Sequence, residues 1–264
     1  LIMSKPKAVL SDVMQTQVIS VHHKQEVEEV AAVISKYDLL AVPVVDKENR
    51  LLGIITVDDV IDIIEAESTE DFQRLSAVMP FEEDYFKRPL PRLFWSRFTW
   101  LAILLFTSLI STTVMEMNAP VLSKMVALAF FIPMVVGTCG NAGTQSATMI
   151  VRAMALGEVQ LSDFGRVFRR ELLMGLALGL ILGLMAYFRV YLQDSNVILG
   201  GVVAVALLST LLMANLVGAL MPMILKRIRL DPALTAGPFI ATLIDAVGIT
   251  IYFQTAVICL ELFA

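Results

Sequence analysis

Charged residues are scarce in this sequence, and cysteine and histidine are nearly absent. Of its 264 residues, 17% are charged and 57% are hydrophobic, whereas soluble domains have about 25% charged and about 45–50% apolar residues. The two cysteines, Cys139 and Cys259, lie in apolar runs, so no disulfide framework is indicated. No cysteine or carboxylate pattern beside His22 and His23 suggests a zinc site. Most of the chain is therefore not expected to fold as a water-soluble domain.

The few charges are distributed unevenly along the chain. Residues 1–86 contain 17 acidic and 7 basic residues, whereas residues 87–264 contain 13 basic and 8 acidic residues. The net charge of −5 thus combines an acidic first part with a mildly basic, very apolar second part. Because nucleic acids are recognised through basic surfaces, this asymmetry argues against a nucleic-acid partner.

Residues 1–65 show the alternating patterns of a small α/β unit. Strands are predicted at 18–21, 41–45 and 51–56, and helices at 27–37 and 57–65. A charged stretch with helix-like spacing follows at 66–91. We therefore expect a soluble domain at 1–65, a connector helix at 66–91 and a third domain at 92–264.

The third domain consists of long apolar stretches. A helix needs about 20 mostly apolar residues to span a bilayer. Five stretches satisfy this requirement, at roughly 93–115, 120–154, 166–191, 197–225 and 234–262. The sequence therefore predicts a mainly α-helical membrane protein with five transmembrane helices, preceded by a small α/β unit.

Lysine and arginine residues predict the orientation of these spans. Eleven of them precede the first span or lie between spans two and three or four and five, and only Lys124 and Arg189 lie on the opposite side. Cytoplasmic loops carry the excess of basic residues. The bias places the N-terminal segment in the cytoplasm and, with five spans, the C-terminus outside the cell membrane.

Asp245 is a carboxylate inside the last apolar span, with no basic residue nearby in the sequence. A charge at the bilayer centre costs about 2.5–3.5 kcal/mol on insertion scales. Such residues normally face the protein interior or a water-filled path. Asp245 is therefore a candidate ion-path residue, and the alternative is a carboxyl that caps a neighbouring helix or stays protonated.

The second span contains an unusual polar and glycine-rich stretch at 137–148. Its three glycines allow close backbone approach, and Asn141, Thr144, Gln145 and Thr148 offer oxygen atoms. The stretch is equally compatible with a small-residue packing interface between helices. Asp245 in another span favours a polar, oxygen-lined conduit over simple packing.

Seven acidic residues and no basic residue lie between positions 58 and 71. In a helix, Asp58, Asp62 and Glu65 share one face, where like charges repel. Carboxylate oxygens are ligands that Mg²⁺ and Ca²⁺ prefer. The run is therefore a candidate metal-binding segment, and the alternative is a solvated helix face.

Three short segments resemble a CBS motif. They are Asp12-Val13-Met14, residues 37–46, and residues 53–59, the last of which has a Gly-x-x-Thr-x-x-Asp pattern. The resemblance places an adenine nucleotide near Thr56 and Asp59. CBS motifs usually work in pairs, and a single one is found, so the sequence is expected to be part of a longer protein.

The chain as a whole resembles the MgtE family of magnesium channels and transporters. The residues that carry the resemblance are 140–148, 231–234 and 241–245, together with 65–71 in the connector. Family members usually carry asparagine at the position of Thr144, so ligation there differs. The family's N-terminal helical domain and first CBS motif have no counterpart in this sequence.

The resemblance implies a homodimer whose pore lies near the subunit boundary and whose ion site is lined by Asp245 of both subunits. Asn141, Thr144 and Thr148 would contribute oxygens to the hydrated ion. In the family, cytoplasmic Mg²⁺ sites hold the connector over the pore when internal Mg²⁺ is high. The resemblance assigns the acids of these sites to Asp59, Asp62, Glu67, Glu70, Asp71 and Asp231.

Two other functions compete with a magnesium channel. A secondary transporter of divalent cations would couple their movement to protons through Asp245. An intramembrane aspartyl protease needs two carboxylates that share one site, and Asp245 alone lies deep in a span. The sequence therefore indicates a transport protein rather than an enzyme.

Overall fold

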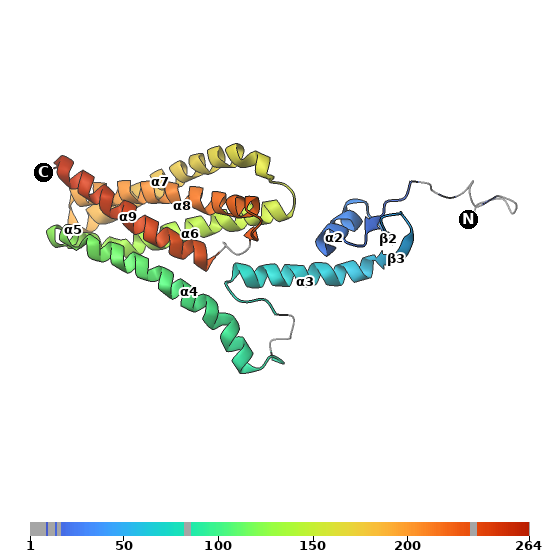
Figure 1. Cartoon of the computed structure of the whole chain (residues 1–264). Helices are drawn as coiled ribbons and strands as arrows, with labels where there is room; N and C mark the ends of the chain where they lie inside the picture. Colours follow the sequence, from blue (N-terminus) through green and yellow to red (C-terminus); the bar gives the residue numbers. More distant parts are fainter. Residues whose placement is uncertain (1–8, 10–13, 15–16, 82–85, 233–236, 264) are drawn as a thin grey trace. The chain divides into compact units, whose positions relative to one another are not determined.

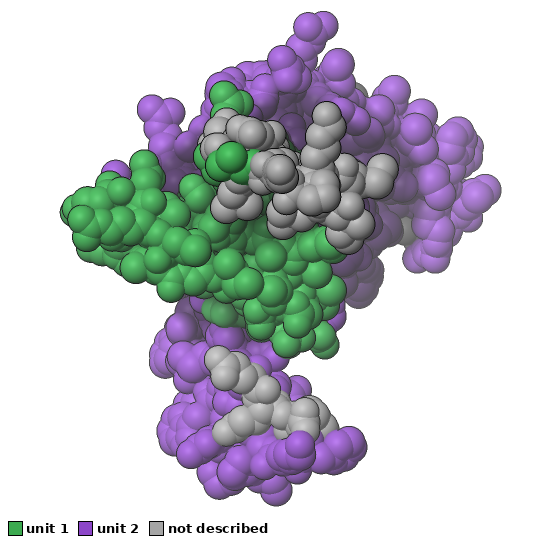
Figure 2. Space-filling view, turned by 90° about the vertical axis from the view of Figure 1, so that its right-hand side faces the viewer, with its two compact units in different colours: residues 1–70 green, residues 71–264 purple. Residues whose placement is uncertain are grey.

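The computed structural model describes residues 9, 14, 17–81, 86–232 and 237–263. The chain forms two compact units, residues 1–70 and 71–264 (Figure 2). Asp12 and Val13 of the first unit, and residues 233–236 before the last span, lie outside the described residues.

The first unit is a three-stranded sheet with one helix packed on it. Strand β1 (Val21–His22) pairs in parallel with β2 (Ala41–Val45), and β2 pairs antiparallel with β3 (Leu51–Thr56). Helix α2 (Val27–Lys36) connects β1 to β2. Its apolar side completes a small core, whose buried residues are Val21, Val30, Ala31, Ile34, Val42 and Val60.

The turn between β2 and β3 is held by one side chain. The Asp46 carboxylate accepts hydrogen bonds from the backbone N–H groups of Glu48, at 2.9 Å, and Arg50, at 2.8 Å. Asn49 adopts the left-handed conformation, with φ of 56°, which asparagine tolerates better than most residues. Local chemistry therefore closes the hairpin, and both of its predicted strands are confirmed residue for residue.

Two local predictions in the first part of the chain need correction. Strand β1 spans Val21–His22, so it shares only Val21 with the strand predicted at 18–21. Helix α3 (Val57–Leu75) continues past residue 65 into the predicted connector helix at 66–91, but it ends at Leu75 rather than near residue 91. It contains neither glycine nor proline, so nothing in its sequence interrupts the helical hydrogen bonds.

The second unit is a helical bundle (Figure 1). Its elements are α4 (Leu90–Met117), α5 (Ala119–Lys124), α6 (Ala127–Ala155), the short 3₁₀ helix η1 (Leu161–Asp163), α7 (Phe164–Asp194), α8 (Val197–Arg227) and α9 (Pro238–Phe263). Five helices, α4 and α6–α9, are long and apolar enough to cross a membrane. The predicted fold class, a five-span helical membrane protein with a small N-terminal α/β part, is confirmed.

Helix α8 lies at the centre of the bundle and packs against α6, α7 and α9. The core between them is apolar and fully buried, as at Leu211 and Phe253. The only polar atom of the Tyr252 side chain is satisfied, because its hydroxyl donates a 2.8 Å hydrogen bond to the Leu128 carbonyl of α6. Helix α4 is different: Ser96 is its one buried residue among those described.

Glycines set the spacing between the helices of the bundle. A Cβ on Gly179 or Gly183 of α7 would lie only about 3 Å from backbone atoms of α8. On Gly218 of α8 it would overlap the carbonyl of Gly143 in α6. Small residues let membrane helices approach closely enough for backbone contact. The glycines of α7 therefore act in packing, as their four-residue spacing indicates.

The Gly143–Gly218 contact predicts that adding one methyl group at position 218 lowers the stability of the bundle. Gly218→Ala must push α6 and α8 apart, so we expect a loss of about 1–3 kcal/mol in unfolding free energy. Gly201→Ala on the same helix is the matched control, because a Cβ there meets nothing within 4 Å. Thermal unfolding in detergent measures both. Equal melting temperatures for the two variants would contradict the close contact.

Candidate functional site

Asp245 lies about two turns into α9, on the side that faces α6. A Cβ built on Gly140 would lie 3.4 Å from Asp245 Oδ1, so the carboxylate rests against the backbone of α6. Asp245 is partly exposed. Among the described residues it makes no hydrogen bond or ion pair. The structure therefore does not support the alternative in which this carboxyl caps a neighbouring helix.

Helix α6 has two polar faces of opposite character. Asn141, Gln145 and Thr148 are exposed and Thr144 is partly exposed. Because they are three to four residues apart, these side chains share one face of the helix, which we call the α6 polar stripe. Gly140 lies one helical turn before Thr144, so the Asp245 carboxylate, which rests against Gly140, lies at the edge of the stripe.

Ser146, on another face of α6, is buried and hydrogen-bonded. Its hydroxyl lies 2.9 Å from Glu171 Oε2 of α7 and 3.1 Å from Asn215 Oδ1 of α8. Both Ser146 and Asn215 are at least nine-tenths buried. One hydroxyl thus joins three spans, and Asn215 acts as a link between helices.

The Asn215 amide is better satisfied in the opposite orientation. As drawn, its Nδ2 is buried without a hydrogen-bond partner. Exchanging Oδ1 and Nδ2 lets the amide donate to Ser146 Oγ, while the Ser146 hydroxyl donates to Glu171. Glu171 is the residue that sequence analysis missed. The sequence contains a signal for Glu171, because an acidic residue within the predicted span at 166–191 needs a polar partner.

The acids of α3 are mostly exposed to solvent. At the start of the helix, the Thr56 hydroxyl donates a 2.7 Å hydrogen bond to Asp59 Oδ2. Hydrogen bonding by Thr56 and by backbone N–H groups lowers the pKa of Asp58 and so keeps it ionised. Within the described part of the chain, no three His, Cys, Asp or Glu side chains lie together as a metal site.

The end of α3 is tied to the membrane helices within the second unit. Arg74 forms an ion pair with Asp231, in the connection between α8 and α9. A Cβ on Gly237, which has φ of 65°, would overlap the Leu75 carbonyl, so the backbones meet there. The structure thus gives Asp231 a partner, Arg74, that the sequence did not suggest.

Comparison with known proteins bears on both parts of the chain. Residues 132–255 match the family model for MgtE, described as a divalent cation transporter, and residues 10–66 match the CBS domain. A magnesium transporter MgtE from Thermus thermophilus is 41% identical over 261 residues, which cover 99% of this chain and 58% of that protein. Proteins of the same name from Enterococcus faecalis and Bacillus subtilis are 39% and 37% identical, each over 97% of this chain and 56% of the relative.

A CBS domain followed by a bundle of helices that are long and apolar enough to cross a membrane defines a multi-pass membrane protein. Within this class, the chain belongs to the MgtE family of divalent cation transporters. It spans a little more than half the length of the curated relatives it matches. The predicted family resemblance is confirmed.

The hydrogen bonds of Ser146 predict that its hydroxyl stabilises the bundle. Ser146→Ala leaves Glu171 and Asn215 without that partner, so we expect a loss of about 1–2 kcal/mol. Ser108→Ala on α4 is the control, because that exposed hydroxyl bonds only to the Leu104 carbonyl of its own helix. Detergent unfolding measures both, and an unchanged Ser146→Ala protein would refute this role.

Proposed function

We propose that this chain forms the conducting part of a Mg²⁺ transport protein, with the ion passing beside Asp245. The observation that carries the proposal is the placement of that carboxylate. It is partly exposed, has no counter-charge among the described residues, and lies at the edge of the α6 polar stripe. The names of the relatives, magnesium transporters, support Mg²⁺ as the substrate.

The chemistry of Mg²⁺ fits these groups. The ion dehydrates reluctantly and prefers six oxygen ligands in octahedral geometry. Asp245 would balance part of its charge, while the oxygens of Asn141, Thr144 and Thr148 accept hydrogen bonds from metal-bound water. Thr144 is shorter than the asparagine usual in the family, so it would contact the ion through water rather than directly.

Exposure of the α6 polar stripe supports a homodimer. Amide and hydroxyl groups that face lipid hydrocarbon lack hydrogen-bond partners, at a cost of a few kcal/mol each. A second copy related by two-fold symmetry would enclose the two stripes around a water-filled path. Each protomer would then contribute one Asp245, so that two carboxylates share one divalent ion.

Acidic residues of α3 supply a mechanism for regulation by internal Mg²⁺. The proposed sensing residues are Asp59, Asp62, Glu67, Glu70, Asp71 and Asp231. Mg²⁺ bound between them would cancel their repulsion and favour a closed state, since a ligand shifts an equilibrium by its differential affinity for the two states. At Asp231, the ion would compete with Arg74.

The excess of basic residues between spans supports an orientation in which α3 and the CBS domain lie in the cytoplasm, where they would sense internal Mg²⁺, and the C-terminus lies outside. An adenine nucleotide at Thr56 and Asp59 would add a second regulatory input. The Thr56–Asp59 hydrogen bond pre-orients both side chains on the same turn of the chain.

Proton-coupled transport of divalent cations is the second candidate. It draws on the same observation, because a carboxyl without a counter-charge inside a span can also carry a proton. Currents through the reconstituted protein separate the two mechanisms. A coupled transporter responds to an imposed pH gradient at constant Mg²⁺, whereas a channel does not.

The role of Asp245 in conduction is tested by Asp245→Asn in liposomes. We expect Mg²⁺ flux to fall about 10–100-fold, since an interaction with a charged group contributes about 1.5–3 kcal/mol. Glu261→Gln, an exposed acid on the same helix, should retain flux. The melting temperature of each variant shows that the fold is kept. Wild-type flux through Asp245→Asn would overturn the proposed path.

Regulation by the acids of α3 is tested by neutralising three of them. The combined variant Glu67→Gln, Glu70→Gln, Asp71→Asn should lose inhibition of flux by Mg²⁺ on the cytoplasmic side. The control removes three exposed acids of the CBS domain through Glu29→Gln, Asp38→Asn and Glu48→Gln. It should stay inhibited. Full inhibition of the α3 variant would count against a sensing role.

A further inference from the structure

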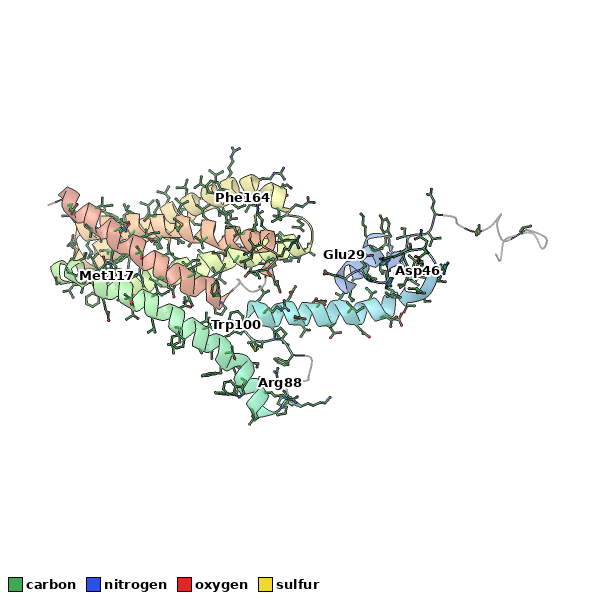
Figure 3. All side chains as sticks on the ribbon, in the orientation of Figure 1. Glu29, Asp46, Arg88, Trp100, Met117 and Phe164 are labelled. Carbon is green, nitrogen blue, oxygen red and sulfur yellow. The ribbon has the colours of Figure 1, made fainter. Side chains whose placement is uncertain are left out.

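A cavity of about 640 Å³ opens between the ends of α6 and α7. Its walls come from the last two turns of α6, the connection through Glu158 and Val159, η1 and the first two turns of α7. Figure 3 labels Phe164, the first residue of α7, at this end of the bundle. The cavity lies apart from Asp245 but reaches Thr148, the last residue of the α6 polar stripe.

Three arginines line this cavity, and two of them have no partner. Arg166 donates a 2.8 Å hydrogen bond to Asp163, which also accepts from the Gln160 backbone N–H. Arg152 and Arg170 make no hydrogen bond or ion pair with any residue that the structure describes. Two cationic side chains, one from each helix, therefore remain available to an anion.

Three acids line the cavity as well, so its formal charges sum to zero, and the two arginines act through their position rather than through a net positive charge. Asp163 is engaged by Arg166, and Glu171 accepts the Ser146 hydrogen bond at the inner end of the cavity. Glu158 is the third acid, an exposed residue in the connecting turn. Beyond the arginines, the backbone N–H groups at the start of the 31-residue helix α7 add partial positive charge.

Much of the remaining lining is apolar, and part of it lies on the exposed surface of α6. Its apolar residues are Met149, Ile150, Ala153, Leu156, Val159 and Val167. Ile150 and Val167 belong to the buried core beneath the cavity. Met149 and Leu156, in contrast, are 71% and 60% exposed on the helix surface. The cavity thus combines two arginines that have no partner among the described residues with a hydrophobic wall that continues onto the exposed surface of α6.

We propose that this cavity binds the headgroup of an anionic phospholipid from the cytoplasmic leaflet. The phosphate would accept hydrogen bonds from Arg152 and Arg170, because a planar guanidinium matches phosphate oxygens. The glycerol and upper acyl carbons would lie against Met149 and Leu156. A soluble phosphate ester would use the same arginines but would leave the apolar wall in water, which favours the lipid.

Such a lipid would clamp α6 to α7 at the end of the span that carries the polar stripe. Bridging Arg152 and Arg170 holds the two helices at a fixed distance. The bound lipid would therefore stabilise the position of Thr148, one turn away from Arg152 on α6. Binding itself requires no transported ion, so its test is independent of the proposed function.

Native mass spectrometry of the detergent-solubilised protein tests the proposal. Dioleoylphosphatidylglycerol, dioleoylphosphatidylcholine and sn-glycerol 3-phosphate are titrated in parallel. We expect saturable binding of phosphatidylglycerol alone. The variant Arg152→Gln/Arg170→Gln should bind it about 30-fold more weakly, and each single variant about 5-fold more weakly. Arg169→Gln, an exposed neighbour outside the cavity, is the matched control and should bind as the wild type does.

Each other result overturns the proposal. Equal binding of phosphatidylcholine would mean that the arginines do not select charge. Equal binding of glycerol 3-phosphate would identify a site for soluble phosphate esters. Equal loss in Arg169→Gln would show general attraction to a basic surface. If the double variant does not fold, the single variants decide, and two single variants with wild-type affinity refute the site.

Discussion

Direct backbone contact between α6 and its neighbours determines the arrangement of the candidate site. Gly143 meets Gly218 of α8, and Gly140 meets the Asp245 carboxylate of α9. These contacts fix the rotation of α6 about its axis. Because a helix turns 100° per residue, fixing that rotation places the Asn141 side chain on the outside. The close contacts of Gly140 and Gly143 thus determine where the groups of α6 that are proposed to contact the ion lie.

The polar side chains of α6 have two different environments. Ser146 is buried and stabilises the bundle, whereas the exposed polar stripe is proposed to act in ion transport. Ser146 is buried and exchanges hydrogen bonds with Asn215 and Glu171, as a stabilising link between spans should. The residues of the polar stripe lie on the outer face and, as exposed groups, need partners from outside the protomer. Asp245 likewise has no hydrogen-bond or ion-pair partner among the described residues. For this reason the stripe and the carboxylate are assigned to one proposed ion path.

The sequence was most informative where a local signal was sufficient. Lengths of apolar runs predicted the spans, alternating apolar patterns predicted strands β2 and β3, and the isolation of Asp245 in an apolar run identified it. Contacts between distant residues were not predictable. Arg74 and Asp231 are 157 positions apart, and the Ser146–Glu171 bond depends on how α6 and α7 rotate. The continuation of α3 beyond residue 65 was missed because its acidic sequence was assigned to a separate connector.

Helix α4 has a consequence for how the protein is made. Its one buried residue among those described is Ser96, and it packs mainly on α9; Figure 1 shows it diverging from the bundle towards Leu90. A ribosome synthesises α4 well before α9. During that interval α4 must persist in the membrane as an independent helix. Phe94, Trp95 and Phe98 form an aromatic cluster near its start. Assembly of this first span therefore waits for the last one to be translated.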